Sequence, residues 1–130
     1  MKKTLIATVV VFLAWEALDA LIHGMILGGA YASTPDLWRP RGEMKLLLLL
    51  LTAFATALCF CTIYAKWIHP RGIQTGLLFG LWFGIALGLG MGFGSYSVMP
   101  VPSSMALAWF LGRTVEGVVA GLIAAALIRD

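Results

Sequence analysis

The chain has 130 residues, of which 61% are hydrophobic and only 12% are charged, and its mean hydropathy is +0.95. These values exclude a soluble globular domain and a disordered chain, and they predict an integral membrane protein. The formal net charge of +3 does not indicate a nucleic-acid partner, because the basic residues lie at the ends of apolar segments and form no extended patch.

Four apolar stretches are each long enough to span a bilayer, which takes roughly 20 helical residues. They cover about residues 4–30, 44–66, 72–98 and 104–128. The first stretch continues to Leu27 with no good small-x-small cleavage site after it, so we expect an uncleaved span rather than a signal peptide. The sequence therefore predicts one transmembrane domain, residues 1–130, folded as an all-α four-helix bundle.

The lysines and arginines predict the orientation of this bundle. In a four-span topology both termini and the second loop share one side. That side carries Lys2, Lys3, Lys66, Arg71 and Arg129, whereas the other side carries Arg39, Arg41 and Lys45. Because basic residues are in excess on the cytoplasmic side, five against three predicts that both termini are cytoplasmic.

The first loop, Tyr31–Met44, is the only sizeable segment outside the spans. Pro35 suits the first position of a helix, and Pro40 would end the turn that it starts. We expect a short amphipathic helix at the outer interface, with Leu37 and Trp38 dipping into lipid.

The third span carries a glycine at every fourth position. The row consists of Gly72, Gly76, Gly80, Gly84, Gly88 and Gly92. In lipid there is little hydrophobic drive for helices to associate, so small residues that let backbones approach take its place. We predict that this glycine zipper packs helices, with Gly76, Gly80, Gly84 and Gly88 as its contact residues. The partner is the fourth span, which offers Gly117, Gly121 and Ala125, or a second copy in a homo-oligomer.

Five polar residues stand where hydrocarbon is expected. They are Glu16, Asp19 and His23 in the first span and Arg113 and Glu116 in the fourth. A charge near the bilayer centre costs several kcal/mol unless it is paired, protonated or hydrated, so such residues indicate a functional site. At 1.5 Å per residue from the inner boundary, both glutamates lie at roughly 18 Å and Asp19 and Arg113 at roughly 22 Å. We therefore predict an Asp19–Arg113 ion pair and a Glu16/Glu116 carboxyl pair.

Three interpretations of this polar cluster stay open. It could be an interhelical clasp that only fixes packing, a site that handles a proton or cation, or a metal centre. The metal ligands would be Glu16, Asp19, His23 and Glu116, but the duplicated Glu-x-x-His pattern of bundle-core di-iron sites is missing. We assign no metal, no particular cofactor and no catalytic residue, since the chain carries no common catalytic motif, and we expect no enzymatic activity.

Several short motifs suggest a relationship. They are Leu18-Asp19, Ile22-His23-Gly24, Tyr31, Trp38-Arg39-Pro40, Glu43-Met44, Gly94-Ser95-Tyr96, Pro100-Val101-Pro102 and Ala106-Leu107-Ala108-Trp109-Phe110, with Glu116 in the fourth span. On these residues the chain resembles a group of small four-span bacterial membrane proteins of unknown function. The resemblance implies a location in the bacterial inner membrane and no particular activity.

From the residues, the leading hypothesis is a small membrane protein that binds or conducts a proton, cation or small polar ligand at the polar cluster. The alternative is a non-catalytic structural or accessory subunit of a membrane complex, whose cluster only fixes helix packing. The lipid bilayer is the expected surroundings in both cases.

Overall fold

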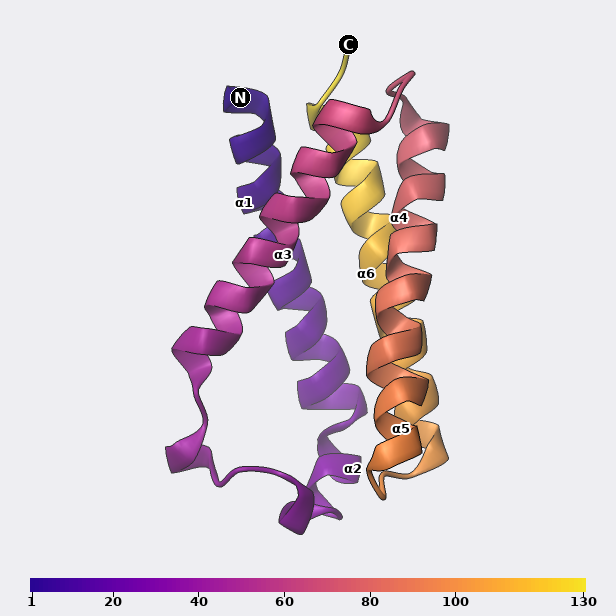
Figure 1. Cartoon of the computed structure of the whole chain (residues 1–130). Coiled ribbons are helices and arrows are strands. Elements are labelled where there is room, and N and C mark those ends of the chain that lie inside the picture. Colours follow the sequence, from indigo (N-terminus) through magenta and orange to yellow (C-terminus); the bar gives the residue numbers. More distant parts are fainter.

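The computed structural model describes all residues, Met1–Asp130, and contains helices and no strands. Four helices are long and apolar enough to cross a membrane: Lys2–Ile26, Leu46–Trp67, Ile73–Val98 and Ser103–Leu127. The prediction of an all-α chain with four such helices is confirmed, although the first helix ends before the predicted residue 30. Both termini lie at the same end of the bundle (Figure 1). There the Asp130 carboxylate lies 2.6 Å from the Arg71 guanidinium of the second loop.

Two of the four long helices change their winding in the half nearer the first loop. The first consists of α1 (Lys2–Asp19) and the π-helical segment η1 (Ala20–Ile26). The third consists of α4 (Ile73–Gly88), the π-helical segment η4 (Leu89–Gly94) and α5 (Ser95–Val98). The other two, α3 (Leu46–Trp67) and α6 (Ser103–Leu127), are α-helical throughout. Because π-helical turns are rare and often lie at functional sites, these two segments indicate the half of the bundle nearer the first loop as the place to look for a site.

The helical elements of the first loop are shorter than predicted. It contains α2 (Gly28–Ala32) and two single 3-10 turns, η2 (Pro35–Leu37) and η3 (Arg41–Glu43). Pro35 starts a turn as predicted, and Trp38 is half-buried against the bundle. Its ring packs edge-on against Trp109, with ring centres 6.0 Å apart, and its indole N–H donates to the Thr34 hydroxyl. The ring turns inward because it gains aromatic contacts and keeps its polar N–H bonded.

The glycine row packs α4 and η4 tightly against α6, as predicted. Gly76, Gly80, Gly84, Gly88 and Gly92 are all buried, whereas Gly72 meets no neighbour. A Cβ added to Gly80 would lie 2.9 Å from the carbonyl carbon of Gly117, and one on Gly84 would lie 2.6 Å from the Arg113 carbonyl oxygen. Since the row is used inside one chain, it is not free to bind a second copy, and the homo-oligomer stays a prediction without this support.

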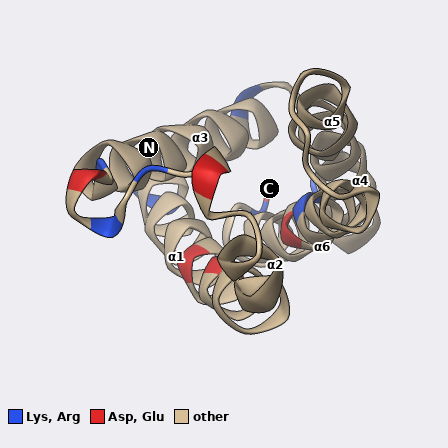
Figure 2. Cartoon of the chain, turned by 90° about the horizontal axis from the view of Figure 1, so that it is seen from below, with Lys and Arg blue, Asp and Glu red and all other residues tan.

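The helix α3 leaves the bundle along its first half. Its ring contacts with α4 all involve Phe60 or Tyr64, and its ring contact nearest the first loop joins Phe54 to Phe12 of α1 at 5.6 Å. The stretch 46–51 is exposed at every residue. Figure 1 shows α3 diverging from the α4–α6 pair, and in the view along the bundle the ribbons of α3 and of this pair lie apart (Figure 2).

We expect Gly80→Ala to lower the free energy of unfolding by about 1–3 kcal/mol, because the added methyl group meets the Gly117 backbone, which cannot move aside. The measurement is unfolding by sodium dodecyl sulfate in mixed micelles, followed by circular dichroism. Gly90→Ala is the matched control, since a Cβ there meets nothing within 4 Å. Equal effects of the two changes would contradict the packing argument.

Candidate functional site

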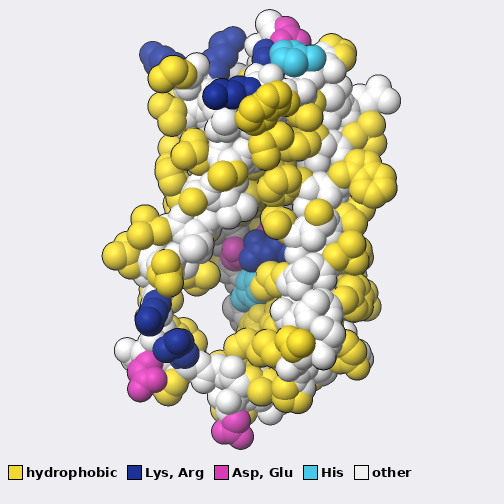
Figure 3. All heavy atoms as spheres, viewed as in Figure 1, with side chains coloured by type: hydrophobic (Ala, Val, Ile, Leu, Met, Phe, Trp, Pro, Cys, Tyr) yellow, Lys and Arg dark blue, Asp and Glu magenta, His cyan; other side chains and the backbone are white.

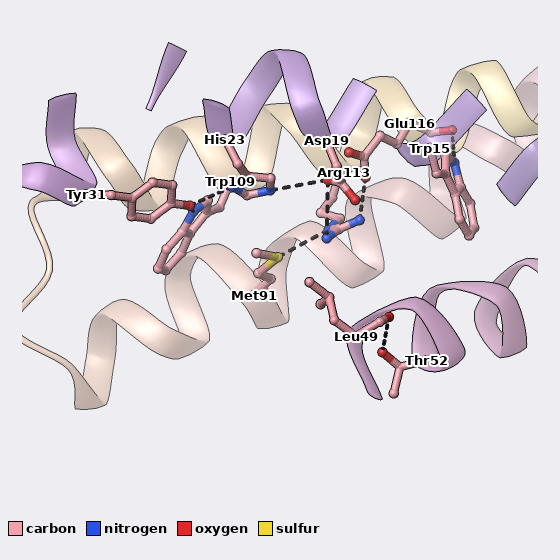
Figure 4. A network of polar contacts seen from close by, with 10 residues as sticks. All are labelled: Trp15, Asp19, His23, Tyr31, Leu49, Thr52, Met91, Trp109, Arg113 and Glu116. Carbon is pink, nitrogen blue, oxygen red and sulfur yellow. Dashed lines mark hydrogen bonds and ion pairs between the residues drawn. The ribbon is translucent and has the colours of Figure 1, made fainter. Parts of the chain in front are cut away.

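The polar cluster is built around the guanidinium of Arg113 (Figure 4). One terminal nitrogen lies 2.5 Å from the Glu116 carboxylate, and the other lies 3.7 Å from Asp19 Oδ1. The Nε–H donates to the Met91 sulfur of η4 at 3.2 Å. The predicted Asp19–Arg113 ion pair is therefore confirmed. Arg113 also contacts Glu116 on its own helix, so side chains from α1, η4 and α6 meet at one cation.

Small residues beside Arg113 let its neighbours approach. On one side Gly84 brings the α4 backbone against the main chain of Arg113 and Thr114. On the other side the Ile22 side chain of η1 lies over Gly112, 3.2 Å from where a Cβ would stand. The glycine row therefore sets the position of the Arg113 backbone as well as the helix contact.

The predicted Glu16/Glu116 carboxyl pair does not form. Trp15, not Glu16, faces Glu116, and its indole N–H donates to the Glu116 carbonyl oxygen at 2.8 Å. Trp15 continues a buried stripe with Ala7 and Val11 at four-residue spacing, and this stripe sets the rotation of α1. Because the next residue on a helix is turned by about 100°, Glu16 does not face Glu116 as Trp15 does, and it has neither an ion pair nor a hydrogen bond.

His23 links the Asp19–Arg113 pair to an aromatic group. Its Nδ1 lies 2.6 Å from the Tyr31 hydroxyl, which accepts a hydrogen bond from the Trp109 indole N–H at 2.7 Å. Its Nε2 lies 3.2 Å from Asp19 Oδ1. Since an indole N–H only donates, the Tyr31 hydroxyl is free to donate to Nδ1. In the neutral imidazole this places the ring proton on Nε2, toward Asp19.

The contacts of Asp19 are ionic rather than aligned hydrogen bonds. Its Oδ1 is buried and accepts no hydrogen bond, although His23 Nε2 and an Arg113 nitrogen lie within 4 Å of it. A carboxylate oxygen in this position is stabilised by nearby positive charge but keeps an unused acceptor direction.

Sequence reasoning missed three members of this site: Trp15, Tyr31 and Met91. Its four-residue spacing from Arg113 put Trp109 on the same helix face, but Trp109 was not assigned to the site. The buried stripe of α1 could have found Trp15. Tyr31 carries no such signal, because it reaches His23 only through the turn of the chain between η1 and α2.

All five predicted polar residues line one cavity of about 1370 Å³. The cavity lies between α3 and the other long helices, and Figure 3 shows a hollow with acidic, arginine and histidine side chains at its back. At mid-depth its wall is formed by Glu16, Asp19, His23, Arg113 and Glu116. Toward the first loop its wall includes Trp38, Arg39, Arg41 and Met44, and α3 contributes Leu49, Thr52, Ala53 and Thr56.

The metal-centre interpretation finds no geometric support. No group of three or more histidine, cysteine, aspartate or glutamate side chains is arranged to hold a metal ion. Asp19, His23 and Glu116 instead engage Arg113 and Tyr31, and Glu16 makes no ion pair.

Comparison of the chain with protein-family models, with curated proteins and with solved structures found no match. The resemblance to small four-span bacterial membrane proteins gains no support from these comparisons and stays a prediction.

Tyr31 lies beyond the first span, and burial raises the pKa of its phenol above the ordinary value of 10.0. The hydrogen bond from Trp109 acts in the opposite direction but is the smaller effect. A raised pKa means that folding favours the neutral phenol. The stabilisation by Tyr31 is therefore complete below the ordinary value and is lost as the pH rises through the folded-state value.

We expect the Arg113→Gln variant to unfold more readily, because Glu116 then stays buried with no positive partner. The double variant with Glu116→Gln should recover part of the loss, giving a coupling energy of about 1–3 kcal/mol in a double-mutant cycle. The free energy of unfolding is measured in mixed micelles for the parent, the two single variants and the double variant. Additive effects would show that the two side chains do not stabilise each other.

A second prediction concerns Tyr31→Phe, which leaves the Trp109 N–H without its partner. The free energy of unfolding should fall by about 1–3 kcal/mol at neutral pH. Above about pH 10 the difference from the parent should shrink, because the parent loses its Tyr31 contribution there. Tyr96→Phe is the control, since its side chain is exposed and makes no hydrogen bond to the rest of the chain. A difference that stays constant with pH would contradict the assignment.

Proposed function

We propose that this chain is a multi-pass protein of the bacterial inner membrane that binds a small polar or cationic ligand at the polar cluster and does not catalyse a reaction. The observation that carries the proposal is the cavity of about 1370 Å³, whose wall includes all five polar residues. Ligand sites typically occupy about 300–1,000 Å³, and they combine apolar walls with a few convergent polar groups.

The lack of an ion-pair partner for Glu16 supports a binding role over a purely structural one. A structural clasp accounts for Arg113, Asp19 and Glu116, because each is paired across or along the helices. It does not account for Glu16, which lines the cavity without any ion pair. An unpaired ionisable group in a span is costly, so its retention is better explained by contact with water or a ligand.

The packed inner half of the bundle favours binding over conduction. On the side of the termini, a core of buried side chains closes the space between the helices; it includes Val11, Trp15, Phe60, Tyr64 and Ala120. The cavity therefore has an opening on the first-loop side and a closed inner end. With both termini cytoplasmic, as the basic residues predict, the opening faces the outside of the cell.

The proposal is tested by chemical accessibility of position 16. In a background with Cys59→Ala and Cys61→Ala, we expect Glu16→Cys to react with a charged, membrane-impermeant methanethiosulfonate reagent. The reaction should be faster than that of Leu13→Cys by about tenfold or more. Leu13 is the matched control because it lies one turn away on α1, is 58% exposed and does not line the cavity. Thr8→Cys, at a fully buried position, should not react.

Two outcomes would count against the proposal. Equal, slow labelling of positions 16 and 13 would mean a closed or lipid-filled space, and the structural-subunit interpretation would then be preferred. In intact spheroplasts the reagent should label position 16 from outside. Labelling only after the membrane is opened would invert the proposed orientation.

A further inference from the structure

We propose that the ligand of this cavity is a lipophilic cation, such as a hydrophobic amine or phosphonium, which enters from the lipid between α3 and the α4–η4 helix. This inference rests on the proposed function and names its ligand class. It is carried by the charges at mid-depth, the apolar and aromatic walls, and the side opening left by α3.

The charges at mid-depth favour a positive group. Three carboxyl side chains, Glu16, Asp19 and Glu116, share the wall with one guanidinium, Arg113. Arg113 is held by Glu116 at 2.5 Å and by Asp19 at 3.7 Å, and no protein cation is left within ion-pair distance of Glu16. A bound cation at this point would provide the missing partner in a medium where an unpaired carboxylate is costly.

The remaining wall suits a bulky apolar body. Between the charged residues and the first loop, the wall includes the rings of Tyr31, Trp38 and Trp109. Helix α4 contributes Phe83 and Leu87. Aromatic faces attract cations as well as apolar groups, so the same wall accepts the charged centre and its hydrophobic substituents. The volume of about 1370 Å³ is ample for a molecule with several rings.

The route follows from the position of α3 and from the charge of the loop-side opening. Residues 46–51 of α3 are all exposed, and Leu49, Thr52 and Ala53 form one edge of the cavity. A lipophilic molecule dissolved in the bilayer therefore reaches the cavity without crossing a packed interface. The loop-side opening carries Arg39 and Arg41, which repel a cation arriving from water.

The test uses tetraphenylphosphonium and tetraphenylborate, two ions of the same shape and opposite charge. The full chain is placed in lipid nanodiscs, and saturable binding of each isotopically labelled ion is measured after subtraction of empty discs. We expect saturable binding of the phosphonium at one site per chain and no saturable binding of the borate. Glu16→Gln should weaken phosphonium binding by about tenfold or more.

Two further variants distinguish the effect of the Glu16 charge from the effect of the cavity volume. Glu43→Gln removes an acidic side chain that lies outside the cavity and should leave binding unchanged. Ala53→Trp fills the cavity from the α3 side without touching a charge and should reduce binding. A folded Glu16→Gln protein is verified by circular dichroism before binding is compared.

Three results would overturn the inference: no saturable binding of the phosphonium, equal binding of both ions, or full binding by Glu16→Gln. If position 16 is nevertheless labelled rapidly by the water-soluble reagent, the polar-ligand site stands and only its assignment to lipophilic cations fails. If position 16 is also unreactive, both proposals fail together.

Discussion

The need to satisfy one permanently charged guanidinium among four long apolar helices organises this molecule. Arg113 keeps its proton in proteins, so its charge must be balanced by contacts rather than removed. Glu116, Asp19 and Met91 provide those contacts from three helices. The requirement explains why the first, third and fourth long helices converge at this depth, and why small residues, Gly84 and Gly112, lie beside the arginine.

The helix α3 does not have to approach Arg113, because it takes no part in balancing its charge. The cavity exists for that reason. This helix contributes no side chain to the contacts of Arg113, and it is held by Phe54, Phe60 and Tyr64 against α1 and α4. Two parts of one small bundle therefore differ in their packing. The α4–α6 pair is in backbone contact through glycines, while residues 46–51 of α3 are exposed and one side of the polar cluster faces the cavity.

The parts of the fold that follow from length and period could be predicted from the sequence. Apolar length predicted the four long helices, and the four-residue period predicted the contact of Gly80 and Gly84 with α6. Depth counting predicted the Asp19–Arg113 pair. It could not predict which of Trp15 and Glu16 faces Glu116, because depth says nothing about rotation, and a turn of about 100° separates neighbours. The place of Tyr31 also escaped prediction, since it depends on the path of the chain after η1.

The one-sided attachment of α3 has a mechanical consequence. Between Leu46 and its nearest ring contact at Phe54 the helix extends about 12 Å, which is the length of a lever fixed at one end. A tilt of about 20°, ordinary for a helix in a bilayer, displaces the free end by about 4 Å. That displacement is close to the thickness of a hydrocarbon chain. On the proposed route, the width of the gap beside α3 would follow the tilt of this helix.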